Sequence, residues 1–179
     1  LTTVFERIRQ AGLTLNKRKC EFACAELDYL GHHVGRGRVE PRRTKVEALL
    51  AFPRPTTRKQ IQSFLGLGGY YRRYIPHFAS LSSTLSDLLK KRTKFVWDAK
   101  AEEAFLDIKS RLASKPVLIA PNFNKPFIIG VDASDMAIGA TLMQEANGIE
   151  RPICYISRKL NAHQKRYATV EKEALALLT

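Results

Sequence analysis

The pattern of apolar and polar positions divides the chain into three stretches with different periods. In the first, up to about residue 38, apolar residues three and four positions apart predict a helix that ends near Gln10. Alternation of apolar and polar residues then predicts two strands, Cys20–Cys24 and Leu27–Val34, closed by a glycine-containing turn. This stretch is therefore expected to pair a helix with a small β unit.

The second stretch has the period of helices and predicts four short ones. The first helix stops at Pro53, because proline cannot continue a helix, and the second ends near Tyr74. Trp97 falls between the last two and is expected to fill part of a small core. The first is expected to begin with Pro41 at a first helical position, the second after a cap at Thr56 or Thr57, and the third at Pro76. The fourth carries Ala101, Ala104, Phe105, Ile108 and Leu112.

The third stretch returns to the period of strands. It predicts the strands Phe127–Val131, Ala137–Gln144 and Pro152–Ile156, with a hairpin turn at Asn147-Gly148, and a helix after Asn161. That last helix has no stop signal, and the first is already under way at Leu1, so the sequence reads as a piece of a longer protein. The whole predicts a mixed chain of the α+β or α/β class with more than one domain.

The charge of the chain is strongly positive and unevenly placed. The formal net charge is +13; residues 1–125 hold 24 Lys and Arg against 11 Asp and Glu, whereas residues 126–179 hold 6 against 6. Such an excess favours binding to a polyanion such as nucleic acid, because each neutralised phosphate releases counterions. A solvated basic surface without a partner is the alternative.

Other classes of protein are disfavoured by composition. No run of about 18 apolar residues is present, so no membrane span is expected. The three cysteines, Cys20, Cys24 and Cys154, show neither a disulfide framework nor the spacing of a zinc site. An intracellular, reducing location is therefore expected.

The predicted helix after Thr57 has two distinct faces. One is an apolar stripe and the other is small, polar and basic. A glycine inside a helix costs roughly 1 kcal/mol relative to alanine, so three glycines in this helix need a reason such as the close approach of another backbone. A nucleic-acid groove and a tightly packed neighbouring helix both fit. The stripe is Ile61, Phe64, Leu65 and Gly68; the other face is Gln62, Gly66, Gly69, Tyr70 and Arg73.

Three carboxylates are candidates for chemistry. Asp132 ends a strongly apolar strand, where an acid can hold a hard cation or simply form a turn. Glu171 and Glu173 flank the apolar stripe of the last helix, and helical geometry does not choose between them. If one of them converges with Asp132, the two could form part of a site for two magnesium ions, since clustered carboxylates repel one another without cations.

Recognisable motifs lie along almost the whole chain and fall into three groups. The first group is Ala11–Phe22 and Tyr29-Leu30-Gly31-His32; the second is Pro53–Thr57, Phe64–Leu67 and Tyr70–Pro76; the third is Val131–Ser134, Gly139-Ala140, Tyr155–Leu160 and Tyr167–Ala176. Together these motifs resemble one family, the reverse transcriptases of Ty3/gypsy-type LTR retrotransposons. The first group resembles the end of the palm, the second resembles the thumb, and the third resembles the first half of the ribonuclease H.

The resemblance implies roles for particular residues. Residues 1–38 would be the palm end with its β-hairpin, 39–115 a small helical thumb, and 116–179 an incomplete ribonuclease H-like fold of three antiparallel strands and a helix. Asp132 and Glu173 would be catalytic ligands of Mg²⁺, or of Mn²⁺, with Glu171 a surface neighbour. The primer grip would be Tyr29, Leu30, Gly31 and His32, and the duplex-tracking face of the thumb would be Gln62, Gly66 and Tyr70, with Arg73 beside it.

The resemblance also implies a function and its partners. The parent protein would be an RNA-directed DNA polymerase that binds template-primer duplex and degrades the RNA of RNA:DNA hybrids, as part of a retroelement polyprotein. Its location would be a cytoplasmic particle or the nucleus. The polymerase aspartates and the later nuclease aspartates of the family are missing from this stretch, so a non-catalytic nucleic-acid-binding relic or a domesticated protein is the rival interpretation.

Overall fold

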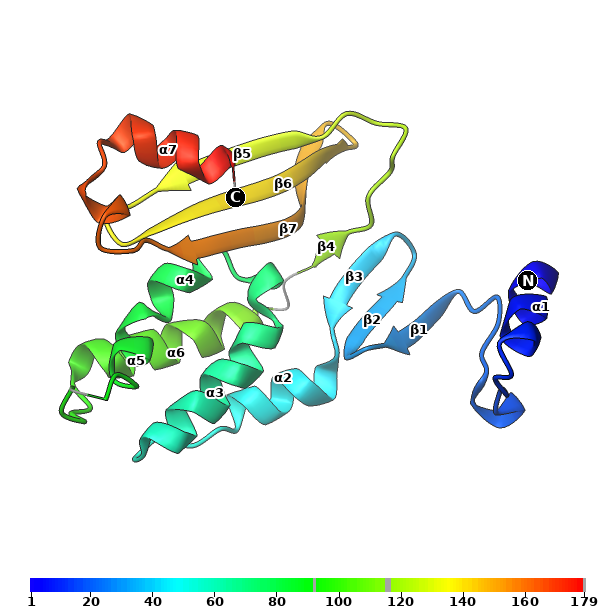
Figure 1. The fold of residues 1–179 in the computed structure, drawn as a ribbon, viewed down its shortest axis with the longest axis horizontal. Helices are drawn as coiled ribbons and strands as arrows, with labels where there is room; N and C mark the ends of the chain where they lie inside the picture. The colour runs from blue at the N-terminus through cyan, green and yellow to red at the C-terminus, as the bar shows by residue number, and fades with distance from the viewer. Residues whose placement is uncertain (92, 115–116, 179) are drawn as a thin grey trace.

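The computed structural model describes residues 1–91, 93–114 and 117–178, and its first part is a helix followed by three strands of a four-stranded sheet. Helix α1 (Thr2–Gln10) buries none of its residues and lies apart from the other elements in Figure 1. The antiparallel sheet has the order β1-β2-β3-β4. Its strands are β1 (Glu26–Tyr29), β2 (His32–Gly35), β3 (Arg38–Pro41) and β4 (Leu118–Ile119).

The predicted strand pair of this part was wrong. Residues 20–24 form no strand, and the backbone there is interrupted by a left-handed residue, Ala23, with φ of 51°. Residues 27–34 are not one strand but parts of two, since Leu30 and Gly31 reverse the chain between β1 and β2. A β-hairpin is therefore present in this part, but its turn lies inside the predicted strand.

The predicted helix start at Pro41 was also wrong. Pro41 is the last residue of β3, paired with His32, and α2 begins two residues later. Because β4 pairs with β3, this sheet contains strands that precede the helical region in the sequence and one strand that follows it. The division at residues 38 and 115 stays a prediction.

The helical region holds five described α-helices, and in Figure 1 it lies below a second sheet, which has three strands. Thr57 caps α3 by accepting from the backbone N–H of Gln60, as expected, and Asp98 caps α6 in the same way. The second predicted helix was too long and the third was not continuous, because a 3₁₀ helix follows Tyr70 and two short helices meet at Ser82. The helices are α2 (Arg43–Leu50), α3 (Arg58–Tyr70), α4 (Phe78–Leu81), α5 (Ser83–Asp87) and α6 (Ala99–Ala113), and none of the described helices is long and apolar enough to cross a membrane.

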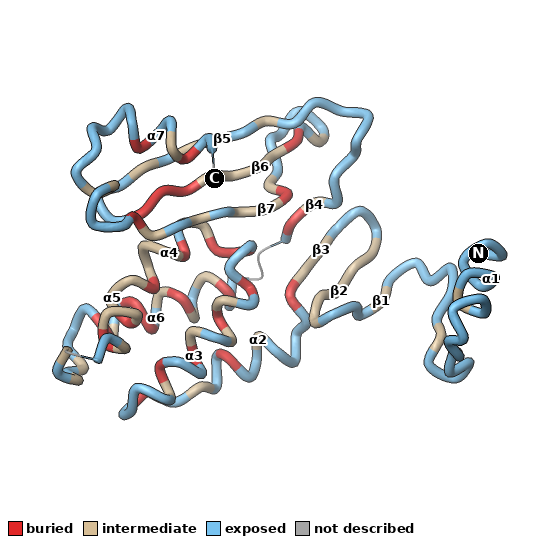
Figure 2. The backbone as a smooth tube through the Cα atoms, in the orientation of Figure 1, coloured by how far each residue is buried: buried red, intermediate tan, exposed pale blue. Residues whose placement is uncertain are grey.

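The main core lies between these helices (Figure 2). The predicted stripe of α3 is confirmed, since Ile61, Phe64 and Gly68 are buried and Leu65 packs against the same cluster. Trp97 is only partly buried; it packs edge-on against the ring of Phe105, and its indole N–H donates to Glu102. The other core members are Leu49, Tyr71, Tyr74, Ile75, Phe78, Leu85, Leu88, Ala101, Ala104, Phe105, Ile108, Leu112 and Leu118.

The second sheet is antiparallel with the order β5-β6-β7. The predicted turn is confirmed, since Asn147 and Gly148 have φ of 57° and 75° between β6 and β7. The last helix was predicted to begin after Asn161, but Ala168 is extended and α7 starts beyond it. The elements are β5 (Ile128–Ala133), β6 (Ala137–Ala146), β7 (Ile149–Lys159) and α7 (Thr169–Leu177).

Polar contacts dock the helices on β7. The backbone N–H of Ala79 donates to Ser157 Oγ over 2.9 Å, and Lys159 Nζ lies 2.8 Å from Asp87 Oδ1. Burial favours the neutral form of Asp87, but the ammonium groups of Lys159 and Lys90 outweigh it and hold the pKa of that carboxyl below its ordinary value. The helical region and the second sheet therefore share a specific polar interface.

Candidate functional site

The β1–β2 hairpin ends in a two-residue turn, Leu30-Gly31, with φ of 44° and 75°. Positive φ at both central positions matches the right-handed twist of the two strands, but it is unusual for a leucine. The side chains of Tyr29 and Leu30 project into solvent, being 60% and 68% exposed. The four residues expected to form a primer grip therefore lie at one hairpin tip.

Tyrosines at the end of α3 and just beyond it hold this tip. The hydroxyl of Tyr70 donates to the carbonyl of Leu30, and that of Tyr71 donates to the carbonyl of Gly31 over 2.8 Å. Tyr74 Oη lies 2.8 Å from His32 Nδ1. The end of α3 and the hairpin, 40 residues apart in sequence, are thus directly joined. Sequence reasoning missed Tyr71 and Tyr74, although both stand in the quoted thumb motif.

His32 lies in the middle of these rings. Its imidazole stacks on Tyr70, with centroids 5.5 Å apart and planes 11° from parallel. Burial, and then the positive charge of Arg73, lower the pKa of His32. A neutral imidazole is therefore favoured at neutral pH, which suits a ring packed among tyrosines.

The open face of α3 continues from this tip. Gln62, Gly66 and Tyr70 are exposed, and a Cβ added at Gly66 would meet no atom within 4 Å. A Cβ added at Gly68 would instead lie 3.5 Å from Ile108, so this glycine faces the core. Gly68 therefore packs against a neighbouring helix, whereas Gly66 does not. The expected contact of this face with a duplex stays a prediction.

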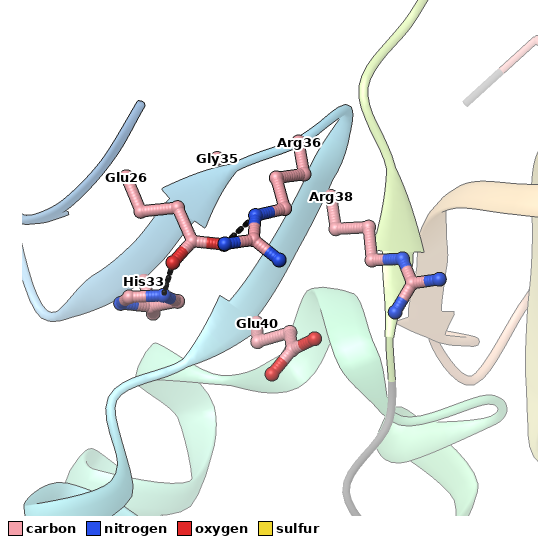
Figure 3. Close-up of a pocket in the computed structure, with 6 residues that line it drawn as sticks. All are labelled: Glu26, His33, Gly35, Arg36, Arg38 and Glu40. Atoms are coloured by element: carbon pink, nitrogen blue, oxygen red, sulfur yellow. Dashed lines mark ion pairs between the residues drawn. The ribbon is translucent and has the colours of Figure 1, made fainter. Parts of the chain in front are cut away.

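A charged pocket of about 330 Å³ lies on the first sheet, where its lining residues come from β1 to β3 (Figure 3). Arg36 pairs with Glu26 at 2.8 Å, and His33 lies 2.9 Å from Asp28. The hydrogen bond to Asp28 raises the pKa of His33, opposite to the shift of its neighbour on the strand. Because Glu26 and Glu40 offset Arg36 and Arg38, the pocket is not a simple anion site.

Asp132 lies near the end of β5, as expected, but it faces the helical region. Strand neighbours alternate between faces, and Val131 and Ala133 pack in the cluster that contains Ala176 of α7. Asp132 consequently points away from α7, and its Oδ2 lies 3.5 Å from His77 Nδ1. A hollow of about 270 Å³ lies beside it, and Gly139 leaves room there, since a Cβ added at this glycine would come within 3.4 Å of His77 Nδ1.

The two glutamates of α7 have different surroundings. Glu171 accepts a hydrogen bond from the backbone N–H of Ala168 over 2.8 Å and so caps the helix. Glu173 is exposed and, within the described residues, its side chain forms no hydrogen bond or ion pair. The buried neighbour is Lys172, whose ammonium group lies 2.9 Å from Asp135.

A divalent cation would need several oxygen ligands at one place. Asp132 offers an exposed carboxylate beside His77, and α7, the helix that carries Glu173, packs on the other face of the strand. Across residues 1–91, 93–114 and 117–178, no three His, Cys, Asp or Glu side chains gather in an arrangement that could hold a metal ion. The metal-binding role expected of Asp132 and Glu173 stays a prediction.

Comparison with known proteins places this geometry in context. Residues 97–179 match the family described as an RNase H-like domain found in reverse transcriptase. The chain is 42% identical over 177 residues to a retrovirus-related Pol polyprotein from transposon 297 of Drosophila melanogaster, and 33% identical over 176 residues to the Tf2-3 transposon polyprotein of Schizosaccharomyces pombe. Both matches span 98% of this chain, but they span only 16% and 13% of the respective polyproteins.

Solved structures share the fold. The foamy viral protease-reverse transcriptase in complex with RNA/DNA hybrid matches 98% of this chain and 24% of its own, with a TM-score of 0.78 and 20% identity. The same viral protein in complex with dsDNA matches with a TM-score of 0.77. The chain therefore belongs to the reverse transcriptase and RNase H region of the gypsy-type retrotransposon polyproteins, and residues 97–179 carry its RNase H-like domain.

Proposed function

We propose that this chain is the part of a retroelement RNA-directed DNA polymerase and ribonuclease H that holds the template-primer duplex. The observation that carries the proposal is the junction of the Leu30-Gly31 tip with the open face of α3 through tyrosine hydroxyls. The primer-grip residues and Gln62, Gly66 and Tyr70 then line one continuous surface. In the parent, an intracellular enzyme of a cytoplasmic particle or the nucleus, the same surface would position RNA:DNA hybrid for the nuclease.

Charge supports the same assignment. Arg73 and its neighbour Arg72 are exposed next to Tyr70, within the part of the chain that holds the whole positive excess. Phosphates on either side of a groove contacted by Gly66 would lie within reach of such side chains. The related foamy viral protein was captured with RNA/DNA hybrid and with dsDNA, the two ligands that the proposal requires.

For the nuclease, we propose that Asp132 and Glu173 act in the parent as ligands of Mg²⁺ or Mn²⁺, the group that would supply charge stabilisation for phosphodiester hydrolysis. Two carboxylates are too few to hold two cations, so further carboxylates would come from elsewhere in the parent, and Asp132 would exchange its contact with His77 for the metal. A chain that binds nucleic acid without cutting it is the second candidate, favoured because no three His, Cys, Asp or Glu side chains of the described residues gather as a metal site.

A salt titration with a charge-matched control tests the proposal. Fluorescence anisotropy would measure the affinity of the chain for a labelled RNA:DNA hybrid from about 50 to 200 mM salt, where loss of phosphate contacts is steep. Arg72→Ser/Arg73→Ser should weaken binding and lower the salt slope by about one unit for each lost phosphate contact. Lys165→Ser/Arg166→Ser removes the same charge from the nuclease part and should change little. Equal losses in both variants, or a flat titration, would contradict the proposed surface.

A further inference from the structure

The Leu30-Gly31 turn is strained and is not held by its own side chains. Leucine at φ of 44° is a rare conformation that persists only where the surroundings impose it. The Leu30 side chain is largely exposed, so its own packing does not supply the restraint. The restraint must therefore act on the backbone of the turn.

Buried groups act on that backbone. The carbonyl of Gly31 accepts from the Tyr71 hydroxyl at 2.8 Å and from the backbone N–H of Arg42 at 3.0 Å. Tyr71 is fully buried, with its ring 5.0 Å from that of Tyr70 and 6.0 Å from that of Tyr74, so the donor is fixed in place. The Gly31 backbone also packs closely against Tyr70, because a Cβ added at Gly31 would come within 3.1 Å of the Tyr70 ring.

His32 is fixed by the second buried tyrosine. Tyr74 is 1% exposed, and burial raises the pKa of its hydroxyl, which therefore remains a donor. With His32 neutral, its Nδ1 accepts from that hydroxyl and the proton of the ring lies on Nε2. The first residue of β2 is thus locked to the thumb just beyond the turn.

We propose that Tyr71 and Tyr74 are positioning residues that hold the Leu30-Gly31 turn beside the open face of α3, so that a duplex meets a preformed surface. Both are buried and do not touch nucleic acid themselves; they act through Gly31 and His32. This inference rests on the proposed function, since it assigns the binding surface its internal support. Preorganisation of this kind lowers the cost of binding without adding a contact.

Tyr71→Phe/Tyr74→Phe tests the inference, because it removes two hydroxyls and keeps both rings. Tyr155→Phe is the matched control: Tyr155 is partly buried against the same core, and among the described residues its hydroxyl has no hydrogen bond. The readouts on the 179-residue chain are the affinity for a labelled RNA:DNA hybrid, the amide signal of Gly31 and the ring nitrogen signals of His32. The double variant should bind about tenfold more weakly, the scale of two lost hydrogen bonds, with both signals displaced.

The outcomes separate this inference from the proposed function. Unchanged Gly31 and His32 signals in the double variant would show that the hydroxyls hold nothing, and displaced signals with affinity within about twofold of wild type would show that the turn need not be held. Either result overturns the inference while leaving the duplex-binding surface intact. A wild-type chain that fails to bind hybrid refutes both. Equal loss of affinity in Tyr155→Phe overturns the positioning role as well.

Discussion

Two glycines in one helix should respond oppositely to the same change. Gly66 and Gly68 are two residues apart on α3, but Gly66 faces open space and Gly68 faces Ile108 and Phe78. Neither has positive φ, so a side chain causes no backbone strain at either position. Replacing each with leucine therefore separates the cost of crowding the core from the cost of filling the outer face.

The structure sets the size of both effects. At Gly66, alanine should raise the free energy of unfolding by about 0.5–1 kcal/mol through helix propensity, and leucine by a similar amount, because nothing in the chain is displaced. For a chain of this size, 1 kcal/mol corresponds to an increase in Tm of about 2–4 °C. At Gly68, atoms beyond a Cβ that is already 3.5 Å from Ile108 must enter the core, where overpacking costs about 1–3 kcal/mol.

Thermal unfolding followed by circular dichroism measures the stabilities, and anisotropy with a labelled duplex measures the affinities. Gly66→Leu should have a Tm at or above that of wild type and bind duplex at least about tenfold more weakly, because its side chain occupies the space that a groove must fill. Gly68→Leu should lose stability and keep its affinity per folded molecule. A Gly66→Leu variant that unfolds early, or that binds like wild type, would refute the assignment of this face.

Three further outcomes are expected. In an NMR titration His33 should have its midpoint above pH 6.5 and His32 should have its midpoint below pH 6.5. His33 therefore adds stability below pH 6.5, and this stability is lost as pH rises through its raised pKa. Because the pKa of His32 is lowered, protonation of His32 reduces stability as pH falls below 6.5. In a gel assay with Mg²⁺, the chain alone should not cleave an RNA:DNA hybrid, whereas a longer parent protein should. Asp132→Asn or Glu173→Gln should abolish cleavage by the parent. Cleavage by the chain alone would disprove the need for further carboxylates. Leu49→Ala should cost about 2–5 kcal/mol in urea unfolding, because Leu49 is fully buried, and a loss under 1 kcal/mol would contradict its place in the core.

The sequence by itself determined the elements whose signals are local. The stripe of α3, the Thr57 cap, the Asn147-Gly148 turn and the strand that ends near Asp132 all follow from spacing of 2 or 3.6 residues or from turn chemistry, which depend on near neighbours alone. The family motifs added the candidate residues of the primer grip, the duplex-tracking face and the metal site. The errors fell where no local signal existed, as at the Leu30-Gly31 turn.

Tertiary structure decided what distant contacts control. The Leu30-Gly31 turn has a poor turn sequence, and it forms where tyrosine hydroxyls some 40 residues away bind its carbonyls. The sequence could not predict the direction of the Asp132 side chain either. Alternation places Asp132 on one of the two faces of β5, but it does not say which face. The packing of α7 on one face and the contact with His77 show that Asp132 lies on the other. Backbone groups and strand faces carry no sequence signature of their partners, because those partners are chosen by the packing of the whole chain.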